Sequence, residues 1–128
     1  MNSKKIVKKP WGKEVWLELN EKYCYKIIYI NKGHRTSYQY HIKKLETNYL
    51  IEGEAEIWLE NDEGIIDKFI MKKDQHFTVL PSRKHRVIAL TDIILQEVST
   101  PEIDDVVRIQ DDAERPDGRI ENEHTQNT

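Results

Sequence analysis

The 128-residue sequence is poor in the residues that cross-link chains and break regular structure, with one cysteine, five glycines and four prolines. The single cysteine, Cys24, cannot form an internal disulfide or supply a CxxC or Cys/His finger spacing, which fits a reducing compartment. No apolar run has the length of a signal-peptide core, and none approaches the roughly 18 apolar residues of a membrane span. We therefore expect a soluble cytoplasmic protein with no membrane partner.

An excess of charge of one sign is also missing, since 20 Lys and Arg stand against 23 Asp and Glu, for a net charge of −3. This near balance disfavours nucleic acid as the main partner. A chain of this length can form a single core but not two domains. Its hydrophobic fraction is only 38% and its charged fraction 34%, yet three Trp, six Tyr and two Phe are too many for a disordered chain. We expect one folded domain with a thin core.

Helical periodicity is not evident, and short β-branched and aromatic segments follow one another instead. In one of them Ala55, Ile57 and Leu59 alternate with mostly charged residues, which is the pattern of a strand with one buried face. About nine strands are predicted, at residues 13–19, 22–30, 35–41, 47–52, 55–60, 65–71, 76–80, 85–90 and 92–98. Many short strands at this spacing predict an all-β sandwich or small barrel.

The two ends of the chain differ from this central part. Residues 1–12 form a basic leader, which we interpret as a solvated arm, with a strand in a dimer contact as the alternative. Residues 13–110 are assigned to the barrel, with 106–109 as a last short strand or helical turn. Residues 111–128 are a polar C-terminal tail that we expect to be frayed.

One predicted strand carries polar side chains on the face where a core is expected. If residues 36–43 are extended, five polar residues share one face: Arg35, Ser37, Gln39, His41 and Lys43. Such a face must line something wet or bind something charged.

A second histidine, His85, lies about forty residues further on, at the start of the apolar segment 87–90. Two imidazoles, a carboxylate and an amide oxygen on one barrel face would make a mixed N/O site for Zn, Mn, Fe or Ni. A lone histidine is more often a surface or hydrogen-bonded residue, so the spacing carries the prediction. His34 and His76 are expected to be solvated.

The spacing of glycine, histidine and glutamate in residues 33–53 resembles the first motif of the cupin superfamily, G(X)5HXH(X)3–4E(X)6G. Gly33, His41, Glu46 and Gly53 occupy its positions, and Gln39 replaces the first histidine. The resemblance implies the cupin fold, a double-stranded β-helix or jelly-roll barrel.

The second cupin motif, G(X)5PXG(X)2H, aligns without gaps but is degraded. Asp74 and Ser82 stand where the family has glycine and Leu80 where it has proline, while His85 keeps the histidine. Asp tolerates a left-handed backbone better than most residues, so the turn at Asp74 remains feasible.

Within the cupins, the chain resembles the C-terminal cupin domain of type II mannose-6-phosphate isomerase/mannose-1-phosphate guanylyltransferases over residues 9–118. The segments that carry the likeness are 9–14, 33–41, 97–100 and 104–108. The histidine-rich H-H-H-R-A-E-H of those enzymes is not matched after His41, and the length leaves no room for the guanylyltransferase half. The resemblance implies four metal ligands, Gln39, His41, Glu46 and His85, and a divalent cofactor, with zinc first and Mn, Fe or Ni as alternatives.

The function implied is a metal-dependent sugar-phosphate isomerase of the mannose-6-phosphate type, which moves a proton between C1 and C2 through an enediol. Lys43 and Glu97 are the candidates for the catalytic base, and Glu46 a third if it is not bound to the metal. Arg35 and Arg108 could clamp a phosphate. For Arg35 a structural salt bridge is an equal alternative, and for Arg108 it is the preferred one. Ser37, on the polar face, completes the substrate-binding set.

Two other functions are open. One is a sugar-nucleotide keto-isomerase or epimerase-like cupin, and the other a non-catalytic module that binds a sugar. The expected partner is a sugar phosphate or nucleotide sugar. A homodimer is also expected, since pairing would cover an exposed edge strand.

Overall fold

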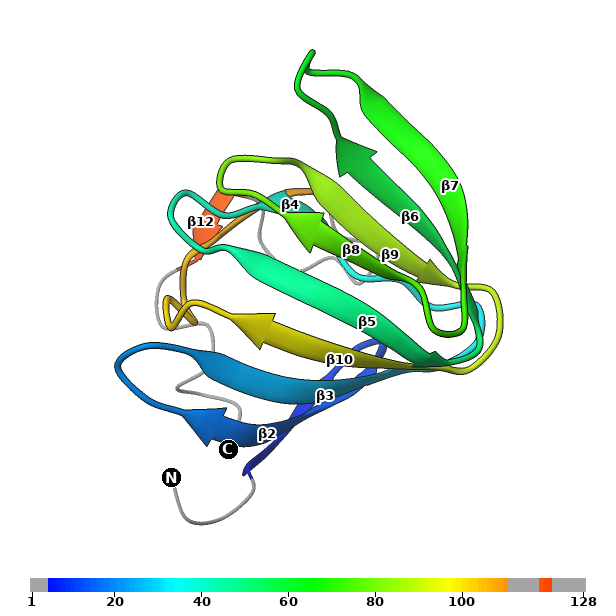
Figure 1. Ribbon diagram of the computed structural model, residues 1–128, viewed down its shortest axis with the longest axis horizontal. Coiled ribbons are helices and arrows are strands. Elements are labelled where there is room, and N and C mark those ends of the chain that lie inside the picture. The colour runs from blue at the N-terminus through cyan, green and yellow to red at the C-terminus, as the bar shows by residue number, and fades with distance from the viewer. Residues whose placement is uncertain (1–4, 111–117, 121–128) are drawn as a thin grey trace.

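The computed structural model describes residues 5–110 and 118–120, and within them the chain forms strands and turns without a helix. No helix long and apolar enough to cross a membrane is therefore present in the part described. Two six-stranded antiparallel sheets face each other (Figure 1), in the strand orders β1-β2-β3-β10-β5-β8 and β12-β11-β4-β9-β6-β7. The all-β prediction is confirmed.

The first sheet contains β1 (Lys5–Lys9), β2 (Gly12–Leu19), β3 (Cys24–Ile30), β5 (Glu46–Glu52), β8 (His76–Val79) and β10 (Ile93–Ser99). The second contains β4 (Tyr38–Tyr40), β6 (Glu54–Glu60), β7 (Ile66–Lys72), β9 (His85–Ala89), β11 (Val106–Gln110) and β12 (Gly118–Ile120). Each of the nine segments from 13 to 98 contains a strand. The strand alternative for 106–109 is confirmed as β11.

The basic leader contributes a strand of the same chain. β1 pairs antiparallel with β2, with Val7 opposite Glu14, and the Val7 side chain is fully buried. The Lys5 ammonium lies 5.2 Å from the centre of the Trp16 ring. Residues 5–9 are thus a sheet edge rather than a solvated arm. Of the predicted polar tail, 118–120 pair with β11, and 111–117 and 121–128 lie outside the described residues.

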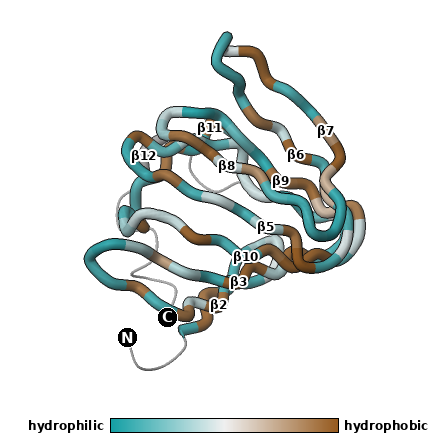
Figure 2. Tube along the Cα trace, in the orientation of Figure 1, coloured by the Kyte–Doolittle hydropathy of each residue, from teal (hydrophilic) through white to brown (hydrophobic). Residues whose placement is uncertain are grey.

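The interior between the sheets is divided into an apolar and a polar part by the strand register. Leu95 on β10 lies opposite Ile28 on β3 and Leu50 on β5, whereas Glu97 lies opposite Lys26 and Asn48. All six side chains are buried. Figure 2 shows that hydrophobic and hydrophilic residues occur along the same strands.

Two turns of the degraded second motif keep the backbone that glycine would favour. Asp74 and Ser82 have φ angles of +72° and +69°, in the left-handed region that non-glycine residues seldom adopt. The Tyr49 hydroxyl donates a hydrogen bond to Asp74 Oδ1 at 2.8 Å. The expectation that Asp74 would tolerate this turn is confirmed, and β8 and β9 can deliver His85 to the barrel.

Candidate metal centre

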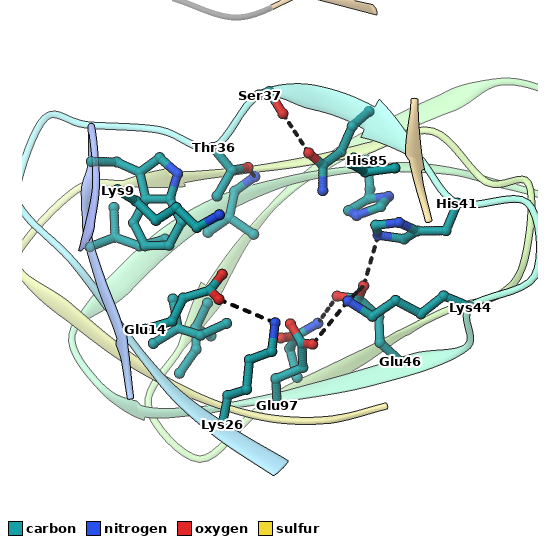
Figure 3. A pocket seen from close by; sticks show the side chains of 18 of the residues that line it. Lys9, Glu14, Lys26, Thr36, Ser37, His41, Lys44, Glu46, His85 and Glu97 are labelled. Atoms are coloured by element: carbon teal, nitrogen blue, oxygen red, sulfur yellow. Dashed lines mark hydrogen bonds and ion pairs between the residues drawn. The ribbon is translucent and has the colours of Figure 1, made fainter. Parts of the chain in front are cut away.

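The polar part of the interior contains a cavity of about 690 Å³, counting its open mouth. Both sheets line it with polar side chains (Figure 3). On the second sheet, Arg108, Gln39 and His85 form a row across β11, β4 and β9. On the first sheet, Lys26, Glu97 and Asn48 form a row across β3, β10 and β5. The register therefore collects in one place residues as far apart in the sequence as Lys26 and Arg108.

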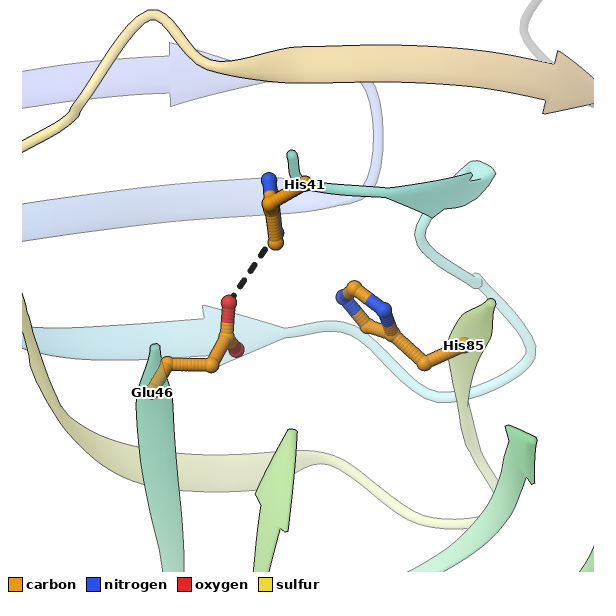
Figure 4. Close-up of side chains that lie close together, drawn as sticks. All are labelled: His41, Glu46 and His85. Atoms are coloured by element: carbon orange, nitrogen blue, oxygen red, sulfur yellow. Dashed lines mark ion pairs between the residues drawn. The ribbon is translucent and has the colours of Figure 1, made fainter. Parts of the chain in front are cut away.

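Three of the four predicted ligands lie together (Figure 4) and line one side of this cavity (Figure 3). His41 follows β4, while Glu46 and His85 begin β5 and β9. All three are at most 5% exposed, and one candidate ligand atom from each lies within 4.8 Å of the others. His41 Nε2 is 3.0 Å from Glu46 Oε1, and the imidazole centroids are 5.1 Å apart.

The hydrogen bonds of the two histidines indicate which nitrogen faces the cluster. His41 Nδ1 is 2.5 Å from the Asp105 carbonyl oxygen, and His85 Nδ1 is 3.0 Å from that of Arg83. A carbonyl oxygen only accepts, so each Nδ1 carries its proton and in the neutral ring each Nε2 keeps a lone pair. A backbone carbonyl behind the ligating histidine is the usual arrangement in metal sites.

The contact between His41 Nε2 and Glu46 is where a cation fits. His41 Nε2 is buried and makes no hydrogen bond among the described residues, although the Glu46 oxygen is close. With Nδ1 protonated, a neutral His41 directs a lone pair toward a carboxylate, and either a proton or a metal ion must lie between them. Two imidazoles and one carboxylate are a common donor set for a divalent metal. The residues present therefore fit such an ion.

The protonation states suit metal binding. Burial lowers the pKa of His85 to about 4, an effect that Glu46 only partly opposes. Burial by itself would raise the pKa of Glu46, but the nearby Lys44 ammonium and the contact with His41 hold it well below its usual range. At neutral pH the His85 ring is therefore neutral and Glu46 ionised, as ligation requires.

Gln39, the fourth predicted ligand, lines the cavity beside His85. The Ser37 hydroxyl donates a hydrogen bond to Gln39 Oε1 at 2.5 Å. The amide oxygen is thus turned toward Ser37, and Ser37 itself is buried and lines the same cavity.

The predicted polar face is broken after residue 41. The Asp105 carboxylate accepts hydrogen bonds from the backbone N–H groups of Ile42, Lys43 and Lys44 at 2.7–3.1 Å, so the chain turns instead of continuing as a strand. Lys44 therefore points into the cavity, and Lys43 is exposed and does not line it. This placement argues against Lys43 as the catalytic base.

The other predicted substrate and catalytic residues divide in the same way. Glu97 and Arg108 are buried and line the cavity. Arg35 is half-buried and does not line the cavity, and its backbone forms an isolated β-bridge with Ile88. The cavity therefore offers one of the two proposed phosphate-binding arginines, Arg108.

The cavity also contains charged residues that the sequence analysis did not select. Lys44 Nζ lies 3.2 Å from Glu97 Oε2 and 3.6 Å from Glu46 Oε1. Further in, Lys26 Nζ lies 3.2 Å from Glu14 Oε1, which also accepts a hydrogen bond from Trp16 Nε1. The signal for Lys26 was its place in the inward phase of β3, while no local pattern marked Lys44.

Comparison with known proteins agrees with this geometry. The family model described as mannose-6-phosphate isomerase C-terminal matches residues 1–111. The chain belongs to this family. No curated protein sequence matches the chain.

Solved structures that resemble this family member are cupins. KdgF from Halomonas sp. has a TM-score of 0.68 at 16% identity, over 80% of this chain and 89% of KdgF. An RmlC-like cupin from Shewanella frigidimarina has a TM-score of 0.66 at 22% identity, over 79% and 86%. Oxalate decarboxylase from Bacillus subtilis, a protein with Mn(II) centres, has a TM-score of 0.68 at 14% identity, over 79% of this chain and 28% of its own. At these identities the likeness shows the cupin fold.

Proposed function

We propose that this cupin is a metal-dependent sugar-phosphate isomerase that interconverts mannose 6-phosphate and fructose 6-phosphate. The observation that carries the proposal is that one cavity combines the donor set His41, Glu46 and His85 with a buried carboxylate, Glu97, and a buried guanidinium, Arg108. These are the groups that an aldose–ketose proton transfer on an anionic sugar requires.

The metal ligands leave room for substrate. Two histidines and one glutamate, with further positions open, form a set found in catalytic zinc sites, and we propose zinc as the resident ion. When bound, the ion would act as a Lewis acid toward the oxygens on the two carbons between which the proton moves.

Glu97 is the proposed proton carrier between those carbons. It projects into the cavity from β10 and is 5% exposed. Its Oε2 atom lies 3.2 Å from the Lys44 ammonium, which holds the carboxylate in place within the cavity. Arg108 faces the same space from the opposite sheet and offers paired N–H donors to a phosphate.

The test is metal analysis of the purified full chain followed by a coupled assay of mannose 6-phosphate isomerisation. We expect a divalent ion at one per chain and turnover that a chelator abolishes. His41→Ala, His85→Ala and Glu97→Gln should each lower kcat at least about a hundredfold. Lys43→Ala is the control, because Lys43 lies outside the cavity and should leave turnover unchanged.

Three outcomes would overturn the proposal. A metal-free protein with full activity would remove the metal from the mechanism. Turnover of nucleotide-linked hexoses alone would favour the keto-isomerase or epimerase-like alternative. Sugar-phosphate affinity without turnover would favour a binding module, a role that the engagement of Glu97 by Lys44 would suit.

A further inference from the structure

Lys44 occupies an unusual place beside the candidate metal ligands. Its side chain is 6% exposed and ends between two buried carboxylates, 3.2 Å from Glu97 Oε2 and 3.6 Å from Glu46 Oε1. The same Glu46 oxygen lies 3.0 Å from His41 Nε2. One carboxylate oxygen thus faces both the ammonium group and the position that a metal ion would take.

The charges of these groups make the ammonium and the metal ion competitors. Lys44, Glu46 and Glu97 together carry a net charge of −1 in a cavity where burial weakens screening. The ammonium compensates the two carboxylates when no metal is bound, and it would repel a dication that ligates the same oxygen. The Lys44 backbone N–H donates a hydrogen bond to the Asp105 carboxylate, which fixes the backbone from which this side chain extends. The ammonium group is therefore restricted in how far it can move away from the site.

We propose that Lys44 is a positioning residue that acts as an internal counter-ion to Glu46: it holds the two carboxylates together in the metal-free barrel and weakens metal binding. The inference rests on the metal site of the proposed function and extends it to the affinity of that site. Glu46 exchanges the lysine for the metal ion when metal enters, while Glu97 keeps the lysine.

The experiment measures zinc affinity of the full-length, chelator-stripped protein by competition with a chromophoric chelator, and the melting temperature with and without zinc. Lys44→Met removes the ammonium but keeps most of the side-chain volume. We expect its zinc affinity to rise about tenfold or more, and its zinc-induced increase in melting temperature to exceed that of the wild type. Lys44→Arg, which restores a cation, should return both values toward the wild type.

Lys26→Met is the matched control. It also removes a buried ammonium from the cavity, one that is paired with Glu14 at 3.2 Å. It should lower the melting temperature but change zinc affinity less than about threefold, because its partner is not a metal ligand. If the loss of any buried lysine altered zinc affinity, Lys44→Met and Lys26→Met would change it equally. Equal changes would therefore overturn the proposal.

A second variant covers the case in which Lys44→Met does not fold. In Lys44→Met combined with Glu97→Gln, the ammonium and its closer carboxylate are removed together, and zinc affinity should again exceed the wild-type value. Unchanged or weaker affinity in the folded variants would overturn the role of Lys44.

The failure of this inference is distinguishable from failure of the isomerase. Wild-type turnover with no gain of affinity in Lys44→Met would refute only the counter-ion role. A gain of affinity in a protein that isomerises no hexose phosphate would refute only the isomerase.

Discussion

Replacement of Asp105 tests whether a residue far along the chain shapes the candidate metal centre. In Asp105→Ala the backbone N–H groups of Ile42, Lys43 and Lys44 lose acceptors at 3.1, 2.7 and 3.1 Å. A hydrogen bond to a charged group contributes about 1.5–3 kcal/mol, less where water can replace it. Because Asp105 is half-buried, we expect a loss of about 2–4 kcal/mol in the free energy of unfolding. Zinc affinity should also fall about 10–100-fold, since the turn positions His41.

Urea denaturation of the metal-free protein measures the stability loss as a lower midpoint at unchanged m-value. Asp62→Ala is the control, because Asp62 is exposed and its ion pair with Arg83 should contribute about 0–1 kcal/mol. A loss below about 0.5 kcal/mol in Asp105→Ala would refute the reasoning.

Acid should remove the same contribution. Burial acts to raise the pKa of Asp105, but the backbone hydrogen bonds from residues 42–44 lower it overall. A lowered pKa in the folded state means that the stabilisation is present above the unfolded value of about 3.9 and disappears as pH falls through the folded value. The difference between the wild type and Asp105→Ala should therefore shrink below about pH 4.

Three further predictions concern pH and the turns. Burial lowers the pKa of His85 to about 4, so between about pH 6.5 and 4 the unfolded chain binds a proton that the metal-free native state does not. The free energy of unfolding should therefore fall over this range by up to roughly 3 kcal/mol. Urea denaturation of His85→Gln should show a weaker dependence of this free energy on pH. Gly53→Ala should lower the free energy of unfolding by more than about 2 kcal/mol, because a Cβ at its φ of +90° would overlap the Asp92 carbonyl. Gly33→Ala, which has a φ of +83° but open space around the new Cβ, should lower it by about 1 kcal/mol, as measured by thermal unfolding. Ser82→Gly should stabilise by up to about 1 kcal/mol, since it relieves a φ of +69°.

Local sequence patterns predicted the strands, and the resemblance to the cupin motifs implied the donor set. Period-two alternation identifies which residues face inward, and Ala55 and Ile57 are fully buried as expected. The spacing in the first motif sets Glu46 at the start of β5, just after the turn that follows His41, and the second motif places His85 at the start of β9. The prediction that these three residues approach one another agrees with the structure, in which His41 directly follows β4 while Glu46 and His85 begin β5 and β9.

The same alternation fails where a distant residue ends a strand. Continued extension would have placed Lys43 beside His41 on the inward face, but the Asp105 carboxylate turns the chain and brings Lys44 inward. Asp105 lies some sixty residues further along, so no window around the first motif contains the cause. The polar face of that segment was predicted correctly at Ser37, Gln39 and His41, while Arg35 and Lys43 do not line the cavity.

Inward-facing charges on β3 and β10 indicate a site only when the two strands are considered together. On β3 the buried phase reads Cys24, Lys26, Ile28 and Ile30, and on β10 it reads Ile93, Leu95, Glu97 and Ser99. Each strand alone resembles a core strand with one unfavourable residue. The antiparallel register aligns the polar ends, with Lys26 opposite Glu97, so the charges meet one another rather than apolar neighbours. The thin core expected from the composition is thus an interior shared between packing and a charge-compensated cavity.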